Sequence, residues 1–299
     1  VRELEQVFSR VERLAVQQLA RQLGVDRSEL SLIGSDIVDI KVGDHSVSTP
    51  LGFCGDTLSV TIFNALARNQ HIEIMVRLAE YLEVDLLHLL PEEYALADCV
   101  PVEEAVVVNV GSLFSSLAWV KGGCPVKMLT VPWGGRNLTR YLASVFQLLP
   151  DQAESLKLRY GLGRLEHEEG QAVRDVVLSG VAEWLVRVES GLAALAGKNS
   201  LPPFIYLCGG GAELPEVLES ARSFPWLRHL NFSRYPEVHA FGPGQIGGVF
   251  NRTGHRWGAE MVVAAALTRW AVPRKPRDEH LESVFKRVVR RNVVVYSGG

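Results

Sequence analysis

The stretch Phe204-Ile205-Tyr206-Leu207-Cys208-Gly209-Gly210-Gly211-Ala212-Glu213-Leu214-Pro215 has the pattern of a buried strand, a glycine turn and the start of a helix. Glycines have no Cβ, so the backbone at 209–211 can approach a flat base or a phosphate closely, and a following helix offers unpaired N–H groups to an anion. The stretch therefore predicts an α/β fold with a place where a nucleotide can sit. By itself, the same pattern also fits an ordinary turn between a strand and a helix.

The composition is that of an ordinary globular protein of one to three domains, since 47% of the 299 residues are hydrophobic and 22% are charged. No apolar run approaches the roughly 20 residues that a membrane-spanning helix needs, so any membrane contact is expected to be peripheral. The cysteines lie far apart without a C-x-x-C pair, which favours a reducing cytoplasm over disulfides or a zinc site. They are Cys54, Cys99, Cys124 and Cys208.

The net charge of −3 is unevenly placed along the chain. From Pro273 onward, seven lysines and arginines oppose three acidic residues, which gives this tail a charge of +4 and the rest of the chain −7. An acidic body argues against broad nucleic-acid binding, whereas a basic tail can seek an anionic surface.

The tail has the pattern of an amphipathic helix on a membrane surface. Its apolar residues project on one side and its basic residues flank them; the members are Leu281, Val284, Phe285, Lys286, Arg287, Val288, Arg290 and Arg291. Each basic residue near an anionic bilayer contributes about 1 kcal/mol. The alternatives are a terminal helix packed on its own domain, or a strand at 293–296.

The opening of the chain predicts a small α+β module. Apolar residues at three- and four-residue steps indicate a helix over 1–23, and stretches rich in Val, Ile and Leu indicate three short strands within 30–42 and 47–62. Helical spacing returns at 65–82, and 84–90 has the pattern of a short strand.

The rest of the chain predicts one sheet with several helices. An apolar strand at 105–110 is followed by strands at 117–120 and 126–131, which together suggest an antiparallel meander. Helices are expected at 92–97, 139–149, 152–160, 171–195 and 258–270.

Two further motifs are assigned no binding role. Gly242, Gly244 and Gly247 spell G-x-G-x-x-G, but Pro243 lies inside the motif and no helical pattern follows, so a loop is predicted. The histidines form no H-x-x-x-H pair on a helix, and no metal site is predicted.

Five blocks occur in the order in which they occur in the actin-like ATPases. They are 91–97 (PEEYALA), similar to the connecting helix that begins E-P-Y-A-L-A; 109–116 (NVGSLFSS), at the place of the second phosphate hairpin D-I-G-G-G-T-T-D; 134–139 (GGRNLT), similar to G-G-N-x-[IV]-T; 153–161 (AESLKLRYG), which resembles A-E-x-L-K-x-x-Y-G; and the turn 209–212 (GGGA). The chain thus resembles this superfamily over residues 1–272.

The resemblance implies an α/β, actin-like (ribonuclease H-like) ATPase fold that binds ATP, with Mg²⁺ only if ATP binds. Glu154 and Lys157 lie three residues apart on one helix face and could reach the ribose together. The residues implied to surround the nucleotide are Glu92, Asn109, Gly111, Gly134, Gly135, Glu154, Lys157, Gly209, Gly210 and Gly211.

Within the superfamily the opening module is similar to that of the FtsA family of bacterial cell-division proteins. The segment 48–55 (STPLGFCG) resembles the N-P-x-G-x-x-G signature of the inserted strand-helix-strand-strand (SHS2) subdomain of that family. The resemblance implies an incomplete SHS2-like subdomain at 1–64, the remainder of the first lobe at 65–104, a second lobe at 105–272 with a small helical sub-lobe at 162–200, and a linker and tail at 273–299. The first strand and the first phosphate loop of the family have no counterpart, so an N-terminally incomplete chain is expected.

The second phosphate hairpin departs from the family pattern. Asn109 stands where the family has an aspartate, and a neutral amide is a weak ligand for a hard cation. Ser112 and Leu113 add side chains where the backbone should approach a phosphate. A weak or lost phosphate site is therefore expected, with at most a weak ATPase activity and no catalytic group identified.

The resemblance implies a scaffold that links the tubulin-like division polymer FtsZ to the cytoplasmic face of the inner membrane and that can self-associate into filaments. A scaffold of pilus assembly like PilM, which binds a short peptide, is the alternative. An ATPase or reactivating chaperone of the same superfamily also stays open.

Overall fold

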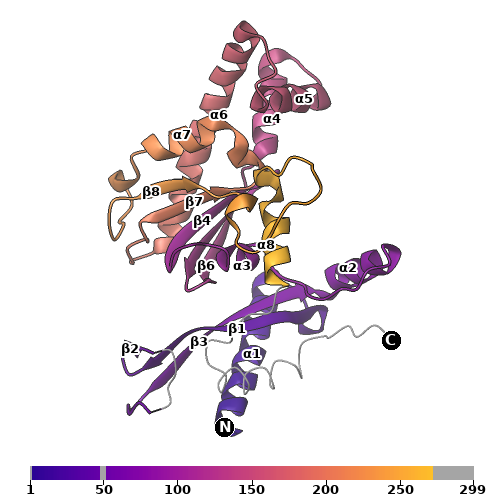
Figure 1. Ribbon diagram of the computed structural model, residues 1–299. Coiled ribbons are helices and arrows are strands. Elements are labelled where there is room, and N and C mark those ends of the chain that lie inside the picture. The colour runs from indigo at the N-terminus through magenta and orange to yellow at the C-terminus, as the bar shows by residue number, and fades with distance from the viewer. Residues whose placement is uncertain (1, 48–51, 272–299) are drawn as a thin grey trace. The chain divides into compact units, whose positions relative to one another are not determined.

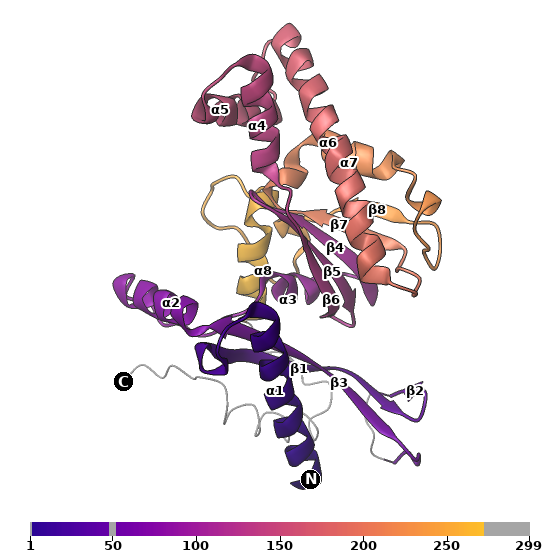
Figure 2. The same ribbon diagram turned by 180° about the vertical axis from the view of Figure 1, so that it is seen from behind.

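The computed structural model describes residues 2–47 and 52–271, with the side chains of 2–9 and of Glu12 excepted (Figures 1 and 2). Between Pro91 and Glu92 these residues divide into two compact units, the second of which ends at Trp270. The basic tail and residues 48–51 of the SHS2-like signature lie outside the described residues.

The first unit is a three-stranded antiparallel sheet with two helices. Its elements are α1 (Arg2–Leu23), β1 (Leu30–Val42), β2 (His45–Ser46), β3 (Leu58–Arg68) and α2 (Asn69–Tyr81), and the strand order is β2-β1-β3. Small and branched apolar side chains form its core, among them Leu30, Leu32, Ile40, Ala65 and Ile72.

Three sequence predictions for this unit were wrong in detail. One 13-residue strand and the two-residue β2 stand where short strands were expected, and β3 begins at Leu58. The predicted helix at 65–82 begins only at Asn69, because Ala65, Leu66 and Ala67 pair with β1. Residues 84–90 form no strand.

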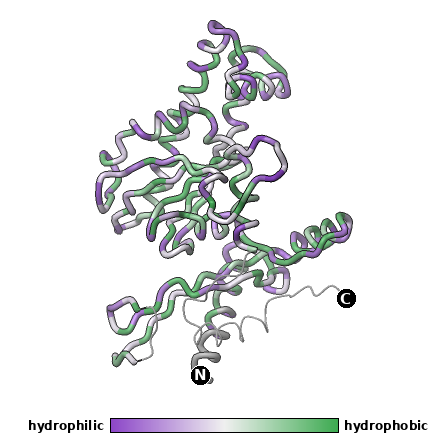
Figure 3. Tube along the Cα trace, viewed as in Figure 1, coloured by the Kyte–Doolittle hydropathy of each residue, from purple (hydrophilic) through white to green (hydrophobic). Residues whose placement is uncertain are grey.

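The second unit is built on a five-stranded sheet in the order β6-β5-β4-β7-β8. The strands β4 (Glu104–Val110), β5 (Ser115–Lys121) and β6 (Cys124–Val131) form the predicted antiparallel meander. The strands β7 (Phe204–Cys208) and β8 (Glu237–Ala240) extend the sheet in parallel to β4. Figure 3 shows hydrophobic residues concentrated along these strands, as expected for a sheet covered on both faces.

Alternate residues of β4 enter two separate cores. Val106, Val108 and Val110 pack with residues of α4 (Gly135–Phe146), α6 (His167–Ala196) and α7 (Pro215–Ser223), to which α5 (Pro150–Gly161) adds Ala153 and Leu156. Ala105 and Val107 pack on the opposite face with α3 (Glu92–Ala97) and α8 (Val262–Trp270). The sheet is therefore the middle of three layers.

The helices of this unit confirm the sequence predictions, with ends that differ by a few residues. The strand β8 was not predicted. Residues 242–247 form a loop with one short 3₁₀ turn, as expected. Among the described residues, no helix combines the length and the apolar character needed to cross a membrane.

Candidate functional site

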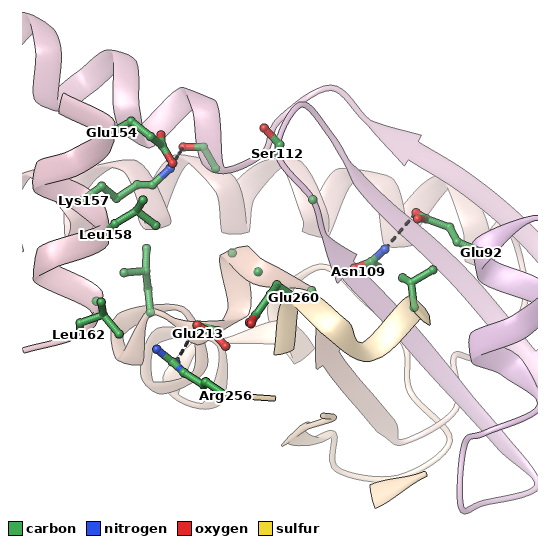
Figure 4. Close-up of a pocket in the computed structure, with 18 residues that line it drawn as sticks. Glu92, Asn109, Ser112, Glu154, Lys157, Leu158, Leu162, Glu213, Arg256 and Glu260 are labelled. Carbon is green, nitrogen blue, oxygen red and sulfur yellow. Dashed lines mark hydrogen bonds and ion pairs between the residues drawn. The ribbon is translucent and has the colours of Figure 1, made fainter. Parts of the chain in front are cut away.

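A cavity of about 640 Å³ lies at the C-terminal edge of the sheet in the second unit (Figure 4). It exists there because β4 and β7 are parallel neighbours, so that the loops after both strands meet at one edge. The register pairs Asn109 with Cys208, which places the hairpin at 111–114 beside the glycine turn at 209–211. The helix α5 and the start of the last helical segment, 259–263, complete the walls.

Nine of the ten sequence-predicted nucleotide-binding residues line this one cavity. They are Glu92, Asn109, Gly111, Gly135, Glu154, Lys157, Gly209, Gly210 and Gly211. The tenth, Gly134, is buried beneath the hairpin, where a Cβ would lie 2.6 Å from Gly111 O and 2.7 Å from Ser112 O. Gly134 therefore supports the wall of the cavity without facing it.

The three glycines of the turn have different roles. Gly209 has a φ of +84°, and a Cβ there would collide with Asn109 Oδ1. A Cβ on Gly211 would collide with Cγ1 of Val110. Gly210 is exposed, and the nearest atom to its Cβ would be Glu260 Cβ at 3.5 Å. Two of the glycines are thus required by packing on β4, and only Gly210 leaves room on the cavity side.

Lys157 holds two helices together. Its Nζ donates to Glu154 Oε2 at 2.8 Å, to Thr139 Oγ1 at 2.9 Å and to Gly135 O at 3.1 Å. These three bonds use all the protons of the ammonium group and fix α5 against the start of α4. The side chain is only 12% exposed.

Glu154 is the more accessible member of the pair, with 41% of its side chain exposed. Burial raises the pKa of this carboxyl, but the hydrogen bonds from Lys157 and Thr139 and the charges of Lys157 and Arg136 outweigh burial and lower it. Within the described residues only Oε2 is hydrogen-bonded, so Oε1 is available as an acceptor.

Backbone carbonyl groups of the hairpin at 111–114 accept hydrogen bonds from the first N–H groups of α4. Gly111 O accepts from Gly135 N at 2.9 Å, and Ser112 O accepts from Arg136 N at 2.8 Å. The first N–H groups of α4 are therefore already satisfied and are not free for an anion. Within the described part of the chain, the Ser112 and Leu113 amides make no hydrogen bond.

Asn109 is tied to the helix on the other face of the sheet. Its Nδ2 donates to Glu92 Oε1 at 2.9 Å, and the Ser116 hydroxyl donates to the same oxygen at 3.2 Å. Asn109 is 5% exposed. Its neighbour across the strand pair, Cys208, is fully buried, and burial with a smaller effect of the Glu92 charge raises the pKa of that thiol. A reactive thiolate is thus excluded at Cys208.

Half of the residues that line the cavity were not predicted from the sequence. Leu158, Leu162 and Leu214 line it, and a Cβ on Gly161 would lie 3.4 Å from Leu214, which shows how closely α5 approaches the segment after the glycine turn. Glu213, Arg256 and Glu260 line the same region (Figure 4). Glu213 directly follows the turn and was within reach of prediction, whereas Arg256 and Glu260 come from a distant segment without a motif.

The tyrosine of the 153–161 block has a structural role. The Tyr160 hydroxyl donates to Oε1 of Glu216, and Arg174 Nε lies 3.4 Å from the same oxygen. Glu216 is 3% exposed, and its Oε2 has no hydrogen bond within the described residues. Burial and the bond to Glu216 raise the pKa of Tyr160. The contact joins α5, α6 and α7.

Comparisons with known proteins identify the architecture. No protein-family model matches the chain, and no curated protein matches it by sequence. The PilM–PilN type IV pilus biogenesis complex contains a chain that matches 88% of this one over 73% of its own length, with a TM-score of 0.53 and 20% identity. The ethanolamine utilization protein EutJ from Carboxydothermus hydrogenoformans matches 69% of the chain, with a TM-score of 0.50 and 16% identity. The fold is that of the actin-like ATPases.

The chain matches only part of the length of each of these proteins. The chain spans 62% of the EutJ chain, so the match covers less than two thirds of that protein. The structural likeness establishes the actin-like fold, which was predicted from the five sequence blocks. At identities of 16% and 20% it does not establish an activity.

Proposed function

We propose that the chain is a nucleotide-binding scaffold of actin-like fold, which holds an adenine nucleotide in the cavity and acts through protein partners rather than through hydrolysis. The observation that carries the proposal is the convergence of nine predicted residues, spread over 92–211, on one cavity of about 640 Å³. A volume of this size is within the range of about 300 to 1,000 Å³ of small-molecule sites.

The adenosine end of the cavity supports base binding. Leu158 of α5 and Leu162, directly after its end, line the cavity together with Gly210 and Leu214, which offers a flat base both apolar side chains and bare backbone. The free Oε1 of Glu154 is an acceptor suited to a ribose hydroxyl. Lys157 would then act by orienting Glu154.

The phosphate end argues against steady hydrolysis. Asn109 supplies no charge for Mg²⁺, and its amide is already bonded to Glu92. Four carboxyl groups line the cavity (Glu92, Glu154, Glu213 and Glu260) against two cations, Lys157 and Arg256. A bare triphosphate would meet an unfavourable field here, so we expect the nucleotide to bind mainly through its nucleoside part.

A titration of the protein with ADP and Mg²⁺ by isothermal calorimetry tests nucleotide binding. Leu158→Glu, at a cavity position 57% exposed, is expected to weaken binding at least tenfold. Val186→Glu, at a position on α6 that is 55% exposed and outside the cavity, is the matched control and should bind like the wild type. Equal loss in both variants, or no binding to the wild type, would contradict the proposal, and phosphate release with ATP measures any hydrolysis.

For the scaffold role, a pilus-assembly function like that of PilM is the first candidate. The PilM likeness covers 88% of the chain and so includes part of the first unit, and the solved structure is a complex of PilM with PilN. A partner peptide is the corresponding proposal for this chain.

An FtsA-like link between a tubulin-like polymer and the membrane is the second candidate. It rests on the 48–55 resemblance and on the basic amphipathic tail. Fluorescence anisotropy with a PilN-type peptide and an FtsZ-type C-terminal peptide separates the two. Saturable binding of one peptide alone selects that role, and binding of neither contradicts both.

A further inference from the structure

We propose that the carboxylate of Glu260, whose segment is held in place by Glu213, accepts a hydrogen bond from the exocyclic amino group of a base bound in the cavity. This inference rests on the proposed nucleotide binding and names the residue that selects among bases. Glu260 lies in the 3₁₀ turn Ala259–Met261, which directly precedes α8.

Glu213 anchors the segment that carries Glu260. Its Oε2 accepts from Arg256 Nη2 at 2.9 Å, and its Oε1 accepts from the Ala259 backbone N–H at 2.7 Å. A Cβ on Gly258 would collide with carboxylate oxygens of both Glu213 and Glu260, so a residue without a side chain is needed between them. Glu213 is thus occupied by the protein itself.

Carboxylate oxygens of Glu213 and Glu260 lie on the same side of Gly258, and each group shifts the pKa of the other. Burial, followed by the bond to Glu260, raises the pKa of Glu213, while the same bond lowers the pKa of Glu260. Arg256 favours the charged form of both groups. The lowered pKa favours the ionised form of Glu260, in which both carboxylate oxygens are hydrogen-bond acceptors.

Glu260 lies beside Glu213 in the cavity wall, at the end that we assign to the base (Figure 4). Glu213 and Arg256 lie near Leu162, away from Asn109 and Glu92 (Figure 4). Glu260 Cβ would be 3.5 Å from a Cβ on Gly210, the glycine that leaves room on the cavity side. A base lying over Gly210, between Leu158 and Leu214, has its edge within reach of the Glu260 carboxylate.

The chemistry at that edge discriminates between purines. The 6-amino group of adenine donates a hydrogen bond, and a carboxylate accepts it with the added strength of a charged partner. Purine riboside has hydrogen in place of this amino group and leaves the carboxylate facing the N1 lone pair. Because a hydrogen bond to a charged group is lost, we expect adenosine to bind about tenfold more tightly than purine riboside.

Calorimetric titration of the full chain with adenosine and with purine riboside tests the inference. Glu260→Leu removes the acceptors and should bring the two affinities to within about twofold, mainly by weakening adenosine binding. Glu260→Gln, which keeps one acceptor, should give an intermediate ratio. Glu237→Leu, at an exposed position on β8, is the matched control and should keep the tenfold ratio.

The outcomes separate the two proposals. If both nucleosides bind the wild type equally well, or if Glu260→Leu keeps the tenfold ratio, base reading by Glu260 is wrong while nucleotide binding stands. If neither nucleoside binds the wild type, both proposals fail. Thermal unfolding of each variant checks that the fold is intact. Because Glu260 is exposed, we expect Glu260→Leu to unfold at the same temperature as the wild type.

Discussion

The side-chain amide of Asn109 donates a hydrogen bond of 2.9 Å to the Glu92 carboxylate. Asn109→Asp would replace this bond by two carboxylates in contact at a site where residue 109 is 5% exposed. We expect a loss of about 2 kcal/mol in the free energy of unfolding at pH 8, and a smaller loss at pH 5, measured by urea denaturation. Adding Glu92→Gln should restore most of the stability, because the glutamine can donate to the new aspartate. No recovery in this double variant would contradict the assignment.

Removing the Tyr160 hydroxyl should destabilise the second unit. Tyr160→Phe takes the hydrogen-bond donor from Glu216, which is 3% exposed, and we expect a cost of about 1 to 3 kcal/mol in urea unfolding. Tyr141→Phe is the matched control, because its partner Glu183 is more exposed and keeps an ion pair with Arg187. Equal costs for the two variants would show that the burial of Glu216 does not matter.

Alanine substitutions in the glycine turn should destabilise the protein by amounts that depend on the position. Gly209→Ala forces a side chain into the left-handed region, which alone costs about 1 to 3 kcal/mol, and the collision with Asn109 adds to this. Gly210→Ala meets only ordinary contacts, so its stability should stay within about 0.5 kcal/mol of the wild type. Thermal or urea unfolding of the two variants gives the comparison, and a large loss for Gly210→Ala would contradict the geometry.

The pKa of Glu154 is lowered in the folded state, and this shift determines how its contribution to the free energy of unfolding depends on pH. The stability that Glu154 contributes is fully present above its unfolded pKa of about 4.3, and it is lost as the pH falls through the lower folded pKa. The stability difference between the wild type and Glu154→Gln should therefore be constant above about pH 5.5 and shrink in more acidic solution. Urea unfolding across this pH range measures the difference, and a difference that stayed constant down to about pH 3 would contradict the assignment.

Much of the fold followed from local patterns in the sequence. The meander β4–β6 and the helices α3 to α7 were predicted, because each carries a full apolar face and clear glycine or proline boundaries. The errors lie where pairing with a distant strand decides the structure. Residues 65–67 look helical by spacing, but β1 holds them as strand. The four residues of β8 are too short to predict and are ordered by β7.

The sequence predicted only those residues of the candidate site that belong to recognisable motifs. Glycines and the Glu154–Lys157 pair mark the walls that carry motifs, and the structure brings them together. Arg256 and Glu260 reach the cavity through the fold alone, and no spacing links them to Glu213 in the sequence. The role of Gly134 as a buried support for the hairpin also required the structure, since only the carbonyl positions of Gly111 and Ser112 reveal it.

The parallel pairing of β4 with β7 has a consequence for the order of folding. The helices α4, α5 and α6 lie between these two strands in the chain, so Asn109 and Cys208 become neighbours only after that whole segment has been placed. Non-local pairings of this kind form late. The cavity would therefore be absent from partly folded molecules, and a ligand that binds it would draw the population toward completed ones by mass action. A partner that recognises only the ligand-bound form would therefore bind only molecules in which β4 and β7 are already paired.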